Sequence, residues 1–201
     1  FGYPAETTKH LVYYGTNSVD SFTLTDNDTI VEVSDAHGLT KSYEAVTQYL
    51  GFHPIEAGKT MGLFPYGKEN NQIPALFDKT GIYPTSNRNL ILPRYPNGAL
   101  INAALYEYLA DSNSQDLTTL DNRRDLAYAV QTQTQEQVLQ LILKAVEQSG
   151  KNNVVLSGGY GLNCVANYFY LDKLNESGIK LYVEPISNDA GTAIGAAMMI
   201  Y

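Results

Sequence analysis

The sequence predicts an α/β fold, and three observations carry that prediction. From residue 125 onward, stretches with helical spacing alternate with short apolar runs, in the order helix, strand, helix, strand, helix. The two apolar runs, at 153–158 and 180–185, are separated by a helix-length stretch, as in a parallel strand pair with a right-handed crossover. The chain has 201 residues and is 44% hydrophobic, which is enough for a sizeable core in one unit or two small lobes.

The first part of the chain is predicted to form strands joined by turns. An apolar and aromatic run at 10–15 ends in glycine, as a strand before a turn does. The stretch 21–35 is typical of two short strands, with Asp26, Asn27 and Asp28 as the turn between them. Residues 1–36 are therefore expected to be mostly β structure.

Three helices are expected next along the chain. At 41–52, apolar side chains recur at helical spacing, and Gly51 suits the C-terminal stop. A second helix is expected at 98–110. The clearest pattern lies at 125–150, where one face is apolar and Gly150 suits a C-cap.

The connections between these helices are polar or rich in glycine and proline. The stretch 56–72 is expected to form a short helix or turn that runs into a loop. Residues 70–97 are expected mostly as loop, and 111–122 as a surface connection. The run NRRD at 122–125 could bind phosphate, but a solvated helix start beside acidic neighbours is the favoured interpretation.

The stretch VVLSGGYGLNCVANY at 154–168 contains the first candidate site. A buried strand is expected to end at Ser157, and open α/β folds bind ligands at the carboxyl ends of their strands. Gly158 and Gly159 let the backbone approach a ligand closely, amides at the next helix start favour an anion, and Asn163 adds a side-chain amide. The alternative is a tight turn that needs positive φ, with Asn163 as a local cap. The pattern is neither a Walker A loop nor GxGxxG, and by itself it favours neither interpretation.

A second turn of the same kind occurs at 184–197. Asn188 and Asp189 follow the second expected strand and precede a helix full of alanine and glycine. Asp189 is either the N-cap of that helix or a carboxylate aimed at a bound cation. Gly191 and Gly195, four residues apart, permit close backbone packing. Two such turns on adjacent strands favour a nucleotide site more than either turn does alone.

Composition argues against two classes of partner. The formal net charge is −8 and the isoelectric point is about 4.8, whereas a nucleic-acid surface needs clustered Lys and Arg. No apolar stretch reaches the roughly 18 residues that a membrane span needs. We therefore expect neither a nucleic-acid nor a membrane partner, and a cytoplasmic location. The single cysteine, Cys164, is expected in the core rather than as a nucleophile, because no histidine is close to it in sequence.

Two blocks of the sequence closely resemble a known family. They are LSGGYGLNCVANYFY with LYVEPISNDAGTAIGAAMM, and SYEAVTQYLGFHPIEAGKTMGLFPYGK upstream of them. Both resemble the carbamoyltransferases of the nodulation-protein and antibiotic O-carbamoyltransferase type. The large domain of that family is related to the universal tRNA threonylcarbamoyl-transfer protein. The resemblance therefore implies a two-lobed fold of the actin, hexokinase and Hsp70 ATPase superfamily, here mostly its C-terminal lobe.

The resemblance also implies a reaction and a set of site residues. In this family carbamoyl phosphate and ATP form carbamoyl-adenylate, and the carbamoyl group passes to the hydroxyl of a small-molecule acceptor. Asp189 is implied as a ligand of a divalent metal, iron or magnesium, while no catalytic residue is identified. The residues implied at the nucleotide, ATP or carbamoyl-adenylate, are Lys59, Gly158, Gly159, Asn163 and Gly191.

By the same resemblance, residues 1–36 are strands from the end of the N-terminal lobe, and 37–201 form the C-terminal lobe. The domain that makes the carbamoyl-adenylate is expected to be absent. The chain is thus expected to be a segment of a larger carbamoyltransferase that is inactive alone. An open sheet edge in such a segment would favour self-association.

Two departures from the family pattern concern the metal. The family uses an H-x-x-x-H segment, and the histidines here, His10, His37 and His53, have no such spacing. The chain also has Tyr14-Gly15 where family members commonly carry Asp-Gly. The metal site is therefore expected to be incomplete in this chain. These departures fit an alternative function, a non-catalytic nucleotide-binding or scaffold homologue of the same fold.

Overall fold

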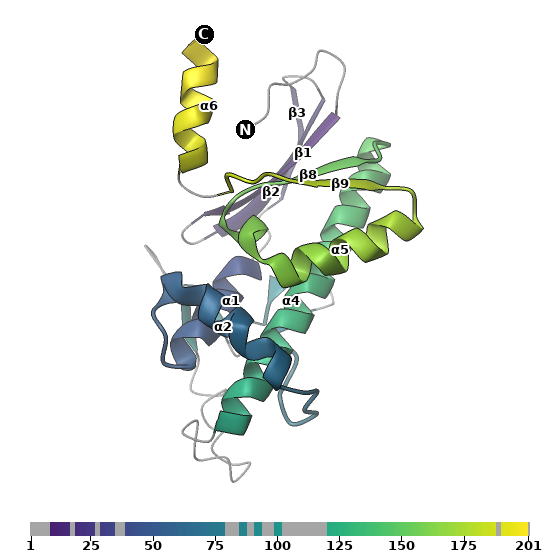
Figure 1. The fold of residues 1–201 in the computed structure, drawn as a ribbon. Helices are drawn as coiled ribbons and strands as arrows, with labels where there is room; N and C mark the ends of the chain where they lie inside the picture. The colour runs from purple at the N-terminus through teal and green to yellow at the C-terminus, as the bar shows by residue number, and fades with distance from the viewer. Residues whose placement is uncertain are drawn as a thin grey trace. The chain divides into compact units, whose positions relative to one another are not determined.

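The computed structural model describes residues 9–16, 19–26, 29–34, 39–78, 85–87, 91–93, 99–101, 120–187 and 190–200 (Figure 1). The chain divides into two compact units. The first comprises Phe1–Val12, Thr23–Val33 and Ile142–Tyr201, and the second comprises Tyr13–Phe22 and Ser34–Leu141. Within the described ranges, no helix has the length and apolar character needed to cross a membrane.

The first three strands form one sheet. Strands β1 (Lys9–Thr16), β2 (Val19–Asp26) and β3 (Thr29–Ser34) lie in the order β1-β2-β3. Of the three residues expected to turn, Asp26 ends β2, and Asn27 and Asp28 lie outside the described residues. The prediction of strands in this part of the chain is confirmed.

A cluster of short helices follows in the second unit. Helix α1 (Leu39–Tyr49) ends at Gly51, whose φ of 85° is a conformation that side chains disfavour. The 3-10 helix η1 (Pro54–Glu56), helix α2 (Ala57–Leu63) and the 3-10 helix η2 (Phe64–Tyr66) come next. The helix at 41–52 and the short helix that runs into a loop are both confirmed. The buried apolar side chains of α1 and its end are Leu39, Tyr43, Ala45, Val46 and Leu50.

Two small hairpins occupy part of the region expected to be loop. Strand β4 (Phe77–Asp78) pairs antiparallel with β5 (Thr85–Ser86), and β6 (Ile91–Pro93) pairs antiparallel with β7 (Ala99–Ile101). The helix predicted at 98–110 is therefore wrong where the structure describes it. Ala99–Ile101 pair with β6 and contact α1, and these tertiary contacts override the helix propensity of Ala and Leu. Residues 102–110 lie outside the described residues.

The long helix α4 (Leu120–Ser149) confirms the clearest sequence pattern. It begins at Leu120 rather than Asp125, so the end of the expected surface connection is helical. Val138, Leu141 and Ile142 are buried as the apolar face predicts, and Gly150 follows the helix with a φ of 65°. Buried polar residues lie on α4 as well: Asp125, Gln131, Thr134, Gln135 and Gln137.

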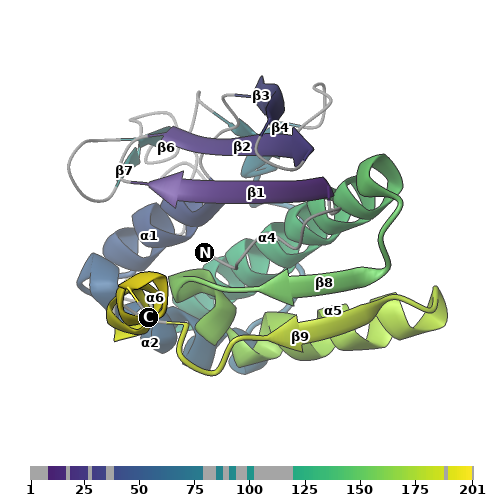
Figure 2. The same cartoon turned by 90° about the horizontal axis from the view of Figure 1, so that it is seen from above.

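The C-terminal part of the first unit carries the predicted α/β series. Strands β8 (Asn153–Leu156) and β9 (Lys180–Val183) pair in parallel, and Figure 2 shows them side by side. Between them come the 3-10 helix η3 (Gly159–Leu162) and helix α5 (Cys164–Glu176), which packs against β9. Helix α6 (Ala190–Ile200) follows β9. The buried side chains of α5 and its end are Ala166, Tyr170, Leu174 and Ile179.

Candidate functional site

The turn after β8 exposes two consecutive glycines. Gly158 has φ 98° and ψ 171°, so backbone geometry alone requires glycine there, as the tight-turn interpretation expects. Gly159 differs, because it is not among the glycines with positive φ. A Cβ built on Gly159 would meet no described atom within 4 Å. Neither backbone strain nor packing within the described residues explains the glycine at 159, whereas close approach of a ligand to its backbone would.

Asn163 caps the helix that follows. Its Oδ1 accepts a hydrogen bond from the Ala166 amide at 3.0 Å, so it is the N-cap of α5. Only 8% of the residue is exposed. The cap interpretation is thus confirmed, and the expected contact of Asn163 with a nucleotide stays a prediction.

The turns that follow β8 and β9 are in contact. The Glu184 amide donates to the Leu156 carbonyl at 2.9 Å, which joins the two strand ends. A Cβ on Gly161 would lie 3.1 Å from Ser187 Oγ, tighter than an ordinary contact. Ser187 is almost fully buried, and its hydroxyl donates to the Glu184 carbonyl. The two glycine-bearing turns therefore form one surface at the carboxyl end of the parallel pair.

The glycine of the second turn has a packing reason. A Cβ on Gly191, in the first turn of α6, would stand 2.6 Å from the Ile186 carbonyl oxygen. Only glycine permits this close backbone approach. Asn188 and Asp189 lie outside the described residues, so the structure gives no geometry for the proposed metal ligand.

A pair of tyrosines ties the glycine-rich turn to α5. The hydroxyls of Tyr160, in η3, and Tyr170, on α5, are 3.0 Å apart. Burial raises the pKa of Tyr160, and burial together with the nearby Tyr160 raises the pKa of Tyr170 well above its ordinary value. On the same helix, Asn167 Nδ2 donates to the Gly161 carbonyl at 2.7 Å. None of these contacts has a local sequence signal, because each depends on how the turn folds back onto the helix.

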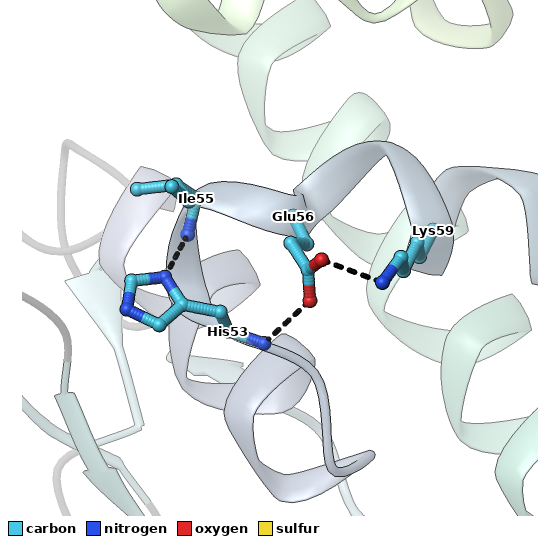
Figure 3. A network of polar contacts seen from close by, with 4 residues as sticks. All are labelled: His53, Ile55, Glu56 and Lys59. Carbon is cyan, nitrogen blue, oxygen red and sulfur yellow. Dashed lines mark hydrogen bonds and ion pairs between the residues drawn. The ribbon is translucent and has the colours of Figure 1, made fainter.

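Lys59 lies on α2, in the second unit, within a small polar network (Figure 3). Its Nζ is 2.5 Å from Glu56 Oε1, and the other carboxylate oxygen accepts from the His53 amide at 2.9 Å. His53 Nδ1 in turn accepts from the Ile55 amide at 3.4 Å, completing a capping box at η1. The bond from Lys59, followed by that from the His53 amide, lowers the pKa of Glu56. The Lys59 side chain is 55% exposed and also lies 5.6 Å from the Phe52 ring centroid.

Arg123 and Asp125, from the run NRRD on α4, contact preceding segments of the chain rather than solvent alone, so the favoured interpretation is wrong for these two residues. Arg123 Nη2 donates to the Leu50 carbonyl at 2.5 Å, and its guanidinium lies 5.2 Å from the Phe52 ring centroid. Asp125 is 8% exposed and accepts from the Lys68 amide at 3.0 Å. Arg123 therefore bonds to the end of α1, and the hydrogen bond from Lys68 satisfies the buried Asp125. Arg123 therefore shares the Phe52 ring with Lys59, a relationship that sequence spacing gave no sign of.

Two further expectations concern reactive side chains. Cys164 is exposed, so its expected placement in the core is wrong; it is the first residue of α5 and is not among the buried residues of that helix. Among the described residues, no group of three or more His, Cys, Asp or Glu side chains is arranged to hold a metal. His10 and Tyr14 lie on β1, and His37 lies outside the described residues.

Comparison with known proteins identifies what the chain is similar to. The family model for the carbamoyltransferase N-terminus matches residues 5–198. This range contains both turns at the ends of β8 and β9, the Lys59 network and all of α4. The match therefore spans the two compact units rather than one motif.

Three curated proteins are similar over most of the chain. The protein sll1178 of Synechocystis sp. is 32% identical over 178 residues, which is 85% of this chain and 28% of that protein. Nodulation protein NolNO of Sinorhizobium fredii is 30% identical over 179 residues, 83% of this chain and 23% of NolNO. Nodulation protein NolO of Bradyrhizobium diazoefficiens is 24% identical over 173 residues, 85% of this chain and 30% of NolO. The chain thus spans less than a third of the length of each relative.

Proposed function

The chain belongs to the carbamoyltransferase N-terminal family, and from that membership we propose that it is the nucleotide-holding part of an O-carbamoyltransferase. In the proposed reaction, hydrolysis of carbamoyl phosphate releases phosphate and carbamate. A carbamate oxygen then attacks the α-phosphorus of ATP, which gives carbamoyl-adenylate and releases pyrophosphate. The oxygen of an acceptor hydroxyl then attacks the carbamoyl carbon, the hydroxyl proton is lost, and AMP leaves. Since the chain spans less than a third of its relatives, this whole reaction is proposed for a longer protein.

The observation that carries the proposal is the exposed backbone at Gly159. Neither φ nor packing among the described residues requires its glycine, so a ligand has room to approach the main chain there. The turn lies at the carboxyl end of a parallel strand pair, where open α/β folds bind nucleotides. Backbone amides at such a turn suit phosphate oxygens, which are anionic and accept several hydrogen bonds.

Lys59 supplies the second argument for a phosphorylated ligand. It is a cation with a half-exposed side chain in a chain of net charge −8, and Glu56 and Phe52 restrict where its ammonium group lies. A lysine contacts phosphate as a point charge. We propose that Lys59 contributes such a contact, with Asn163 and Gly191 as further members of the nucleotide site.

The proposed fold is the C-terminal lobe of a two-lobed, actin-like ATPase. Its support is the parallel pair with a connecting helix and the family membership. The open space beside Gly158 and Gly159 supports the proposed nucleotide contact, whereas the described residues do not provide the donor set of a complete metal site. Asp189 remains a proposed single ligand, and no step of the proposed reaction passes through a metal.

Titration calorimetry with ATP tests the proposal directly. We expect the unchanged chain to bind ATP and Gly159→Ala to bind at least about tenfold more weakly, a difference of about 1.4 kcal/mol in binding free energy. The added methyl group meets open space, so thermal stability should not change. Gly62→Ala, on α2, is the matched control, because its Cβ also meets no described atom within 4 Å. Equal affinity of the Gly159→Ala variant and the unchanged chain would contradict the proposed loop contact.

A non-catalytic nucleotide-binding homologue is the second candidate. The observation that favours it is Tyr14 on β1, at the position where the resemblance expects a carboxylate. A protein of this kind would bind ATP with the same dependence on Gly159 but would not carbamoylate a hydroxyl acceptor. Measuring ATP binding and carbamoyl transfer on the same full-length protein separates the two candidates.

A further inference from the structure

The glycine-rich turn has one side-chain anchor. Of the four residues Gly158–Gly161, three are glycines, and Tyr160 alone carries a side chain. Glycine has more conformational freedom to lose than any other residue, so a turn of this composition is loose unless something holds it. The contacts of the Tyr160 side chain therefore determine how well the turn is ordered before a ligand binds.

Helix α5 holds this turn at two points. Tyr170 is fully buried, and its hydroxyl lies 3.0 Å from that of Tyr160. Asn167, three residues earlier and on the same face of the helix, donates to the Gly161 carbonyl at 2.7 Å. The two contacts fix the residues on the C-terminal side of Gly159, whose own backbone stays exposed.

We propose that Tyr170 is a positioning residue for the nucleotide: through its hydrogen bond to Tyr160, it holds the Gly158–Gly159 backbone in the conformation that receives phosphate. The identity of the ligand rests on the proposed function, whereas the ordering of the turn does not. A binding site that is ordered in advance loses less conformational entropy when the ligand binds. Loss of the hydroxyl of Tyr170 should therefore weaken binding without removing any atom that touches the nucleotide.

The two hydroxyls work as a matched pair. A buried hydroxyl that loses its partner is destabilising, whereas removal of both partners is close to neutral. Tyrosine has an ordinary pKa of about 10 and burial raises the pKa of both residues further, so both hydroxyls are protonated near neutral pH and one can donate to the other. Tyr170→Phe thus leaves Tyr160 with an unpaired hydroxyl that draws the turn away from α5 toward water.

Amide hydrogen exchange measured without ligand tests the ordering of the turn. In Tyr170→Phe, the amides of Gly161 and Asn163, which donate to carbonyls within the turn, should exchange at least about tenfold faster, while those of Lys180 and Glu184, which donate to the chain of β8 and its flanks, stay near their original rates. Tyr168→Phe, on the same helix but 74% exposed, is the matched control and should change neither group. Uniformly faster exchange in the turn and the strands would show a merely structural role and overturn the inference.

ATP affinity measured on the same variants separates this inference from the proposed function. We expect Tyr170→Phe to raise the dissociation constant about tenfold and Tyr168→Phe to leave it unchanged. If the unchanged chain binds ATP and Tyr170→Phe binds equally well, the positioning role is wrong and the proposed function stands. If the unchanged chain does not bind ATP, the proposed function fails together with the role of Tyr170 toward a nucleotide.

Discussion

Gly67 lies directly against the main chain of Arg124. A Cβ at position 67 would stand 2.1 Å from the Arg124 carbonyl oxygen and 2.9 Å from the Cβ of Tyr128. The rings of Phe64 and Tyr128 stack at 5.3 Å beside this contact, and the Arg124 guanidinium lies 5.8 Å from the Tyr66 ring centroid. The loop after η2 therefore crosses α4 at a point where only a hydrogen atom fits.

Gly67→Ala should be strongly destabilising for this reason. The two atoms nearest to the new methyl group belong to the backbone of α4, which cannot move aside as a flexible side chain does. We expect the free energy of unfolding in urea to fall by about 3 kcal/mol, the upper end of overpacking costs. Gly62→Ala, on α2 with no described atom within 4 Å of its Cβ, should instead stabilise by about 0.5–1 kcal/mol. The test is that the two variants change the free energy of unfolding in opposite directions. A Gly67→Ala variant with unchanged stability would show that the loop is not in contact with α4.

Tyr43→Phe should destabilise the second unit through a buried acceptor. The Tyr43 hydroxyl donates to Gln131 Oε1 at 2.8 Å, and both residues are buried. Loss of the hydroxyl removes this donor from a buried amide oxygen, for which we expect a cost of about 1–3 kcal/mol in urea unfolding. Tyr182→Phe, at an exposed position on β9, should change stability by less than about 0.5 kcal/mol. If Tyr43→Phe and Tyr182→Phe changed the free energy of unfolding by similar amounts, the result would argue against the hydrogen bond between Tyr43 and Gln131.

The Glu56 carboxylate should make stability depend on acid pH. The bonds from Lys59 and the His53 amide lower the pKa of Glu56 below its ordinary value of 4.5, so the folded state favours the charged form. This contribution is fully present above pH 4.5 and is lost as the pH falls through the lower pKa of the folded state. The free energies of unfolding of the unchanged chain and of the Glu56→Gln variant should therefore differ most near neutral pH and become equal in acid. A difference that stays constant across this range would refute the assigned shift.

The tyrosine pair should make stability depend on alkaline pH. Burial raises the pKa of Tyr160 and Tyr170, so in the unfolded chain these groups ionise near their ordinary pKa of about 10, while the folded chain keeps its protons. The free energy of unfolding should consequently fall as the pH rises above about 10. A Tyr160→Phe, Tyr170→Phe double variant should show a shallower fall. The chain contains 16 tyrosines, so the difference in tyrosinate absorbance between the two proteins is needed to isolate this pair. Parallel stability curves for the two proteins would contradict the raised pKa values.

Local patterns predicted the elements whose signals are local. The helix stop at Gly51 follows from residue types and their neighbours alone. The positive φ of Gly158 and the cap by Asn163 belong to one of the two interpretations that the local pattern left open. The parallel pairing of β8 and β9 follows from the order of elements. These features needed no knowledge of which distant residues come together.

The missed features all depend on distant contacts. Ala99–Ile101 has a helical composition but pairs with β6, and Arg123 donates to a carbonyl 73 residues earlier in the chain. Gln131 is fully buried because the Tyr43 hydroxyl, 88 residues away, is there to meet its side chain. A polar residue that is satisfied in this way has the same sequence signature as one that faces water. Cys164 illustrates the converse, since a residue type that is usually buried begins a helix on its exposed side.

The contact between Gly161 and Ser187 has a consequence for protein engineering. The two residues come from different turns, and a methyl group at 161 would already lie 3.1 Å from the Ser187 hydroxyl oxygen. A side chain at position 161 therefore requires Ser187 to shift by a few tenths of an ångström. Positions 161 and 187 need to be varied jointly, with any gain in side-chain volume at one matched by a loss at the other. Recombination between relatives should likewise transfer both turns as one block.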